Sequence, residues 1–81
     1  MALPSQLDHD KLSEVALAIL GLGAFRDHQS TRAWKGMDWD LLDLLYAKGW
    51  IADPKGPAKS VVFTDEGAGL AQELLARHFA K

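Results

Sequence analysis

Apolar side chains recur at steps of three and four residues near the start of the chain, which predicts a helix over residues 9–22. Asp8 precedes this segment and suits a helix N-cap, because its carboxylate can accept a hydrogen bond from a free backbone N–H. Gly21 or Gly23 is expected to end the helix. The apolar face predicted from the spacing consists of Leu12, Val15, Ala16, Ile19 and Leu22.

The helical pattern stops in residues 26–36, where polar side chains gather. We expect a loop or a short irregular element here that ends in a strand over Thr31–Trp34. This stretch is also the most basic part of the chain, with Arg26, Arg32 and Lys35 against one acidic residue, Asp27.

A second helix is predicted over residues 38–48, with Asp38 as its cap and Gly49 after its last turn. Large apolar side chains cover more than half of its circumference, so we expect it to be enclosed by the other helices and the hairpin. Those side chains are Trp39, Leu41, Leu42, Leu44, Leu45 and Tyr46. Only the stripe of Asp40, Asp43 and Ala47 is expected to meet solvent.

The following residues read as a β-hairpin and a third helix. Trp50–Ile51 and Ser60–Phe63 are the expected strands, and the prolines and glycine of residues 53–59 indicate the turn between them. Thr64 is a good cap for the last helix. Its expected inward face is Leu70, Ala71, Leu74, Leu75 and Phe79, and Glu73 with Arg77 forms an expected i,i+4 ion pair outside.

This order of elements predicts one α+β domain over residues 1–81, winged-helix-like, with three main helices and a two-stranded β-hairpin wing. The 81 residues include no cysteine, so packing alone must stabilise the fold, which suits a reducing cytoplasm. The longest apolar run, Val15–Phe25, contains two glycines and is too short for a membrane span. It follows acidic residues, so it does not read as a signal peptide.

Two longer motifs carry resemblances to known families. The segment LLDLLYAKGWI at Leu41–Ile51, followed by a basic turn and VVFTDEG, resembles the recognition helix, wing and following helix of MarR-like winged-helix regulators. The combination of AWKGMDWDLLDLLYAKGWI with AKSVVFTDEG resembles a family of small uncharacterised bacterial proteins, a domain of unknown function of about this length. The resemblance implies a cytoplasmic bacterial protein with a winged-helix-like fold, and it implies no activity.

The winged-helix layout allows a DNA-binding interpretation. The second helix would enter a major groove, while Arg32, Lys35, Lys55 and Lys59 would contact phosphates. The base-facing turn of that helix instead offers Asp38, Asp40 and Asp43, which repel the phosphate backbone. The net charge of -2 adds no general attraction to nucleic acid. Any single one of these basic side chains is more simply explained as a solvated surface charge, and Arg26 and Arg32 can pair with these carboxylates.

The competing interpretation is a protein-interaction module or a homodimer, which we prefer slightly. Three tryptophans are a large aromatic content for so small a chain, and the simpler expectation places all of them in the core. A tryptophan exposed beside charged groups would instead suit an interface. The residues that would form it are Trp34, Lys35, Asp38, Trp39, Asp40 and Asp43.

Catalytic and metal-binding interpretations have little support. His9, His28 and His78 lie in three separate segments, and no serine has the setting of an activated nucleophile. Asp40 and Asp43 share a helix face, but paired carboxylates on an exposed stripe are usually solvated. We therefore expect no catalytic residue, no metal and no cofactor.

Overall fold

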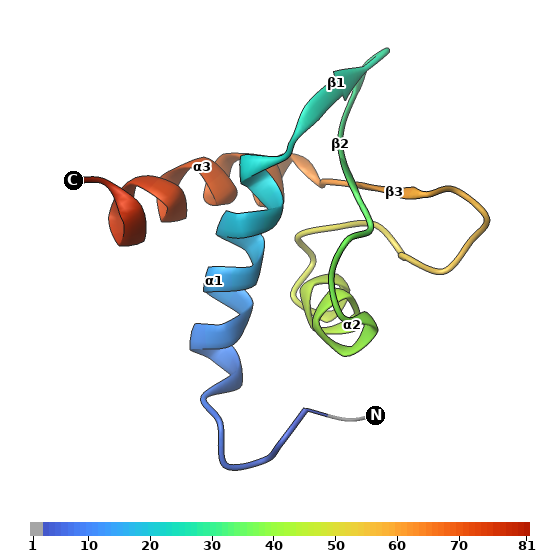
Figure 1. The fold of residues 1–81 in the computed structure, drawn as a ribbon. Helices are drawn as coiled ribbons and strands as arrows, with labels where there is room; N and C mark the ends of the chain where they lie inside the picture. The colour runs from blue at the N-terminus through green and yellow to red at the C-terminus, as the bar shows by residue number, and fades with distance from the viewer. Residues whose placement is uncertain (1–2) are drawn as a thin grey trace.

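The computed structural model describes residues 3–81, which form three α-helices and one three-stranded antiparallel sheet (Figure 1). The sheet order is β1-β2-β3, and α1 packs against both other helices. The elements are α1 His9–Leu22, β1 Phe25–Asp27, β2 Ser30–Trp34, α2 Trp39–Ala47, β3 Ser60–Val62 and α3 Asp65–Phe79.

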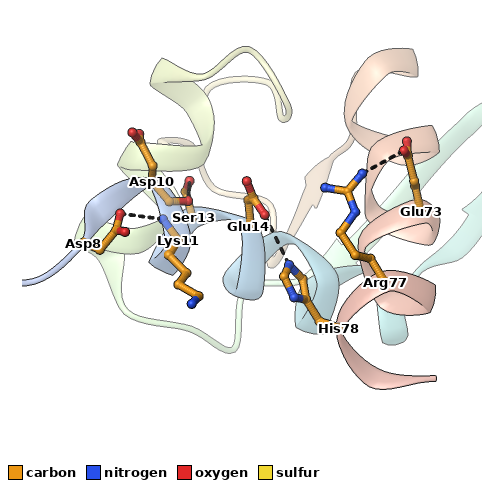
Figure 2. Close-up of polar contacts among 8 residues, drawn as sticks. All are labelled: Asp8, Asp10, Lys11, Ser13, Glu14, Glu73, Arg77 and His78. Carbon is orange, nitrogen blue, oxygen red and sulfur yellow. Dashed lines mark hydrogen bonds and ion pairs between the residues drawn. The ribbon is translucent and has the colours of Figure 1, made fainter. Parts of the chain in front are cut away.

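The predicted bounds and cap of α1 are confirmed, because Asp8 Oδ1 accepts a hydrogen bond from the Lys11 backbone N–H at 3.0 Å (Figure 2). The predicted buried face is right for Ala16 and wrong for its C-terminal part. Ile19 and Leu22 are 48% and 72% exposed. The cause is that α1 lies between α3 on one flank and α2 with the sheet on another. Its buried residues are Ser13, Ala16, Leu17, Ala18, Leu20 and Gly21.

Small residues bring α1 and α3 close together. A Cβ added to Gly21 would lie 2.7 Å from the Cβ of Ala71, so the two backbones approach more closely than larger side chains would allow. Further along the pair, the ring of His78 lies 3.2 Å from Glu14 Oε1 (Figure 2). The expected pair on the outer face of α3 is confirmed, with Arg77 donating to Glu73 at 3.0 Å.

The strands predicted over Thr31–Trp34 and Ser60–Phe63 are found as β2 and β3, whereas the predicted main pairing of Ser60–Phe63 with Trp50–Ile51 is wrong. Phe25–Asp27 forms a further strand, and the turn to β2 is closed by His28 in the left-handed region at φ 57°. The predicted wing is reduced to one bridge pair between Ile51 and Phe63, since β3 takes β2 as its ladder partner. Residues 53–59 leave the ladder, because the ring nitrogens of Pro54 and Pro57 carry no N–H.

The core fills the space between α1, α2, α3 and the inner face of the sheet. Fully or almost fully buried side chains include Leu17, Leu42, Leu45, Ile51 and Leu74. The caps predicted for the other two helices are confirmed: Asp38 Oδ2 accepts from the Asp40 N–H at 2.9 Å, and Thr64 Oγ1 accepts from the Gly67 N–H at 3.0 Å. Phe79, which was expected inside, is half exposed at the end of α3.

An ion pair joins α1 to the end of α2. The Lys48 ammonium donates a hydrogen bond to Asp10, and this contact with the attraction of opposite charges holds the pKa of the Asp10 carboxyl below its ordinary value. A carboxyl with a lowered folded-state pKa contributes stability that is complete above its unfolded-state pKa. That contribution is lost as the pH falls through the folded-state pKa.

We expect Asp10→Asn to lower the urea midpoint of unfolding slightly at neutral pH, since the pair is exposed. The difference from the unsubstituted protein should disappear once the pH is below the folded-state pKa. Lys48→Met should lose at least this increment, because it removes the ion pair and also the ammonium that lies 5.8 Å from the Trp50 ring centroid. The double variant should lose little more than Lys48→Met alone, because the ion pair is already absent in that variant. A difference that persists unchanged at acidic pH would contradict this role.

Candidate interaction surfaces

Two of the three tryptophans lie largely outside the core. Trp34 is 63% exposed and Trp39 is 53% exposed, whereas Trp50 is partly buried against the core. The simpler expectation, that all three fill the core, is therefore wrong for Trp34 and Trp39. Leucine side chains from α1 and α2, together with Ile51 and Phe63, already occupy the interior.

Strand alternation places Trp34 on the outer side of the sheet. Ala33 is buried, so its neighbours Arg32 and Trp34 point to the opposite side. Phe25 pairs with Arg32 in the ladder, and its ring centroid lies 5.1 Å from that of Trp34 at an interplanar angle of 34°. Arg32 Nε donates to the Ser60 hydroxyl at 2.8 Å. We call this surface the sheet face: Phe25, Arg32, Trp34 and Ser60.

Of the four basic residues predicted for nucleic acid, Arg32 belongs to the sheet face, while Lys35 follows β2 and Lys55 and Lys59 lie in the loop before β3. Strand alternation puts Lys35 and Lys59 on the side of the sheet opposite Trp34. The Lys35 N–H donates to the Lys59 carbonyl at 2.9 Å, and Lys35 Nζ lies 3.3 Å from the carbonyl oxygen of Gly56. These contacts hold the loop that carries Lys55 and Lys59 beside the end of β2. Within residues 3–81, no ion pair joins Arg26 or Arg32 to the aspartates of α2. Arg26 donates instead to the Thr31 hydroxyl at 2.9 Å, and Arg32 bonds Ser60.

The second surface lies on α2, which is less enclosed than predicted. Its buried side chains are Leu42 and Leu45, because the helix packs mainly against α1. Trp39, Asp43 and Tyr46 follow one another at steps of four and three residues, so they share the exposed side. Tyr46 is 47% exposed. We call this surface the helix face: Trp39, Asp43 and Tyr46, with Asp38 and Asp40 at its start.

The predicted partner-binding residues are thus divided between the two surfaces. Trp39, Asp40 and Asp43 belong to the helix face, and Trp34 belongs to the sheet face. Lys35 connects them, since its Nζ lies 5.4 Å from the Trp39 ring centroid. Sequence reasoning missed Tyr46, although its spacing of seven residues from Trp39 and three from Asp43 indicated the shared side.

A shallow hollow of about 160 Å³ lies beside Trp34. Its lining has no ionisable side chain, so it offers apolar contact and no acid–base group. The lining residues are Ile19, Leu20, Gly23, Ala33, Trp34, Gly36 and Met37.

The remaining structural findings concern metals and membranes. In the described part of the chain, no three His, Asp or Glu side chains gather into a set that could hold a metal ion. None of the helices formed by residues 3–81 is long and apolar enough to cross a membrane.

Comparison with known proteins identifies relatives without assigning a role. "Uncharacterized protein y4hR" from Sinorhizobium fredii strain NGR234 is 41% identical over 76 residues, which cover 94% of this chain and 99% of that protein. No solved structure matches the chain. The resemblance to a domain family of unknown function is confirmed, while the MarR-like resemblance stays a prediction. Residues 8–81 match the family described as "Domain of unknown function (DUF6429)", and the chain therefore belongs to that family.

Proposed function

We propose that this chain is a non-enzymatic binding module that contacts a protein partner through the helix face. The observation that carries the proposal is the exposure of Trp39 and Tyr46 on one side of a nine-residue helix. Aromatic side chains of this kind are enriched at protein interfaces, where their large apolar area leaves water and their polar ends keep hydrogen-bond partners.

The charge of the helix face indicates which partner it suits. Asp38, Asp40 and Asp43 give residues 38–47 three negative charges and no positive one. Two copies that met symmetrically through this face would oppose like charges, which disfavours such a homodimer. A basic segment of another protein would be complementary, and its Lys or Arg side chains could also stack on Tyr46.

The alternative is a winged-helix DNA-binding regulator in which α2 enters a major groove. The same three aspartates weigh against it, because they would lie among phosphates. The cations that favour DNA, including Lys55 and Lys59, belong to the loop beside the sheet and not to α2. We therefore place duplex recognition by α2 second.

An NMR titration tests the proposal. Isotopically labelled protein is mixed with an amphipathic peptide of leucine and lysine, and separately with the same peptide carrying glutamate in place of lysine. We expect saturable shifts over α2 with the lysine peptide alone. Tyr46→Ala should weaken that binding roughly tenfold or more, as truncation of a central aromatic contact does. Asp43→Lys should also weaken it, because the charge complementarity is reversed.

The matched control is Phe79→Ala, which removes an equally exposed aromatic ring from the end of α3. It should bind the lysine peptide like the unsubstituted protein. Equal binding of both peptides, or shifts that avoid α2, would refute the assignment of this face. Sedimentation equilibrium of the protein alone is expected to give a monomer, and a dimer abolished by Asp43→Lys would favour self-association instead.

A further inference from the structure

The side of α1 that faces away from the core is aliphatic, and the contact proposed for α2 does not use it. Its four side chains are Leu12, Val15, Ile19 and Leu22, which we call the α1 face. We propose that the α1 face binds the α1 face of a second copy of this chain, with the two helices antiparallel. The inference is independent of the proposed peptide contact and concerns a different helix.

The α1 face meets solvent along the helix. Ile19 and Leu22 are 48% and 72% exposed, and Leu12 and Val15 are partly exposed. Leu7, in the turn before the helix, adds a side chain that is 46% exposed. Two shallow hollows lie along this side. Leu7, Leu12 and Val15 line one of about 320 Å³, and Ile19 lines the hollow of about 160 Å³ described above. Contiguous apolar surface of this kind marks a contact site.

The spacing of the α1 face selects a helix as the partner. The steps from Leu12 to Val15, from Val15 to Ile19 and from Ile19 to Leu22 are three, four and three residues. This is the spacing of the seam between two paired helices, in which each side chain fits between residues of the facing helix. The stripe covers about 15 Å of helix at a rise of 1.5 Å per residue. The matching partner is therefore a helix with an uncharged aliphatic stripe of similar length.

A second copy of the chain supplies that helix. Glu14, the one ionisable residue within residues 12–22, lies on the flank toward α3, where it contacts His78. The α1 face itself carries no charge, so two copies can meet without opposing like charges. The exposed sides of the other helices are charged, with aspartates on α2 and with Glu73 and Arg77 on α3. A two-fold contact uses the same patch on both copies, and the α1 face is self-complementary in this sense.

Charge at the ends of α1 favours the antiparallel arrangement. The Lys11 ammonium extends away from Asp10 and Glu14 and forms no ion pair within residues 3–81 (Figure 2). Asp8, at the same end, accepts a hydrogen bond from the Lys11 N–H as the cap of its own helix. The last turn of α1 has no basic side chain, and the C-terminal end of a helix carries partial negative charge. Antiparallel pairing brings each Lys11 to that end of the other copy, whereas parallel pairing would oppose the two ammonium groups.

The area of the α1 face predicts a weak dimer. Together with Leu7 it exposes roughly 300–400 Å² of apolar surface per copy, about half of what each partner contributes to an interface of standard size. A contact of this size is transient, with a dissociation constant on the order of 0.1 mM. The chain is therefore expected to be a monomer at low micromolar concentration and mostly a dimer at about 1 mM.

Sedimentation equilibrium from about 5 µM to about 1 mM tests the proposal. The average mass is expected to rise from that of the monomer towards twice that value. Leu22→Ala should weaken the association roughly tenfold or more, because two-fold symmetry removes the truncated contact twice. Leu22→Asp should abolish the association, since two carboxylates would enter an apolar contact. Both variants should keep the helical circular dichroism of the unsubstituted protein, because Leu22 is mostly in water in the monomer.

A spin label determines the orientation of the two helices. The chain has no cysteine, so Gly23→Cys gives a single labelling site just after α1, and a Cβ there makes only an ordinary contact at 3.9 Å. The spin-labelled variant is mixed with isotopically labelled unsubstituted protein at about 1 mM. Antiparallel pairing should broaden the amide signals of residues 9–12 in the isotopically labelled copy. Broadening centred on residues 20–22 instead would overturn the antiparallel arrangement.

Tyr46→Ala is the matched control. Tyr46 is 47% exposed on α2, nearly the same fraction as Ile19 on the α1 face. The control should self-associate like the unsubstituted protein, and so should Asp43→Lys. A mass that stays at the monomer value up to about 1 mM would overturn the inference. A dimer that survives Leu22→Asp, or one that Tyr46→Ala weakens, would also overturn it. Absence of a dimer leaves the peptide contact through α2 intact, and loss of peptide binding leaves the dimer intact, so the two failures are distinguishable.

Discussion

Replacing Gly67 with alanine should destabilise the fold by about 3 kcal/mol or more, as expected for an overpacked site that cannot relax. A Cβ at this position would lie only 1.9 Å from the carbonyl oxygen of Trp50. That carbonyl cannot simply move away, because it accepts a hydrogen bond from the Thr64 N–H at 3.0 Å. The loss is large beside the roughly 4–12 kcal/mol of total stability that a chain of this length has.

The same helix offers a matched control two residues later. Gly69 is exposed, and a Cβ added there would meet nothing within 4 Å. Gly69→Ala should therefore stabilise the protein by about 0.5–1 kcal/mol, because alanine loses less backbone entropy in a helix. Urea unfolding followed by circular dichroism measures both variants. If Gly67→Ala unfolds within about 0.5 kcal/mol of the unsubstituted protein, α3 does not begin against the Trp50 carbonyl as described.

Features set by neighbouring residues could be predicted from the sequence. The caps at Asp8, Asp38 and Thr64 depend on a side chain and an N–H only two or three residues away, and all three are confirmed. The bounds of α1 follow from its cap and the glycine after its last turn. These contacts form within one turn of helix, so no knowledge of the tertiary arrangement is needed.

The sheet could not be predicted as well, because strand pairing depends on distant parts of the chain. Ser60–Phe63 was assigned to a hairpin with Trp50–Ile51, the nearest extended segment. In the fold β3 pairs with β2 instead, and Val61 lies opposite Ala33 in the core. Residues 50–52 still run beside β3, as the 2.9 Å hydrogen bond from the Ala52 N–H to the Val62 carbonyl shows. The prediction placed residues 50–52 correctly beside β3, but it missed β2, which is the main ladder partner of β3.

The candidate surfaces illustrate the same limit. The basic character of residues 26–35 is visible in the sequence, but the approach of Lys59 to Lys35 depends on the β2–β3 pairing. On α2, Asp43 was rightly assigned to the solvent side, whereas Asp40 is partly buried. Trp39 and Tyr46 were assigned to the interior by their apolar area alone. Because α2 packs mainly against α1, only one face of α2 is buried. Trp39 and Tyr46 lie on the other face and remain exposed.

Replacing Leu17 with alanine is expected to destabilise the protein by about 2–5 kcal/mol, as for other fully buried leucines. Leu17 lies in the middle of α1, in the core cluster with leucine side chains of α2 and α3. Removing its side chain would leave a cavity between these helices, which collapse only partly because α1 is held on two flanks. Leu22→Ala should change stability by less than about 0.5 kcal/mol, since that side chain is mostly in water.

This pair of variants distinguishes the two faces of α1 directly. Residues 15–22 are apolar almost throughout, so spacing alone does not decide which side is buried. If the face predicted from spacing were the buried one, Leu22→Ala would be the damaging change and Leu17→Ala the mild one. Guanidinium unfolding of both variants gives the two free energies under identical conditions, and the identical chemical change removes differences in side-chain type. Leu17→Ala is expected to be the more destabilising variant, because α3 covers α1 on one flank and α2 with the sheet covers it on the other.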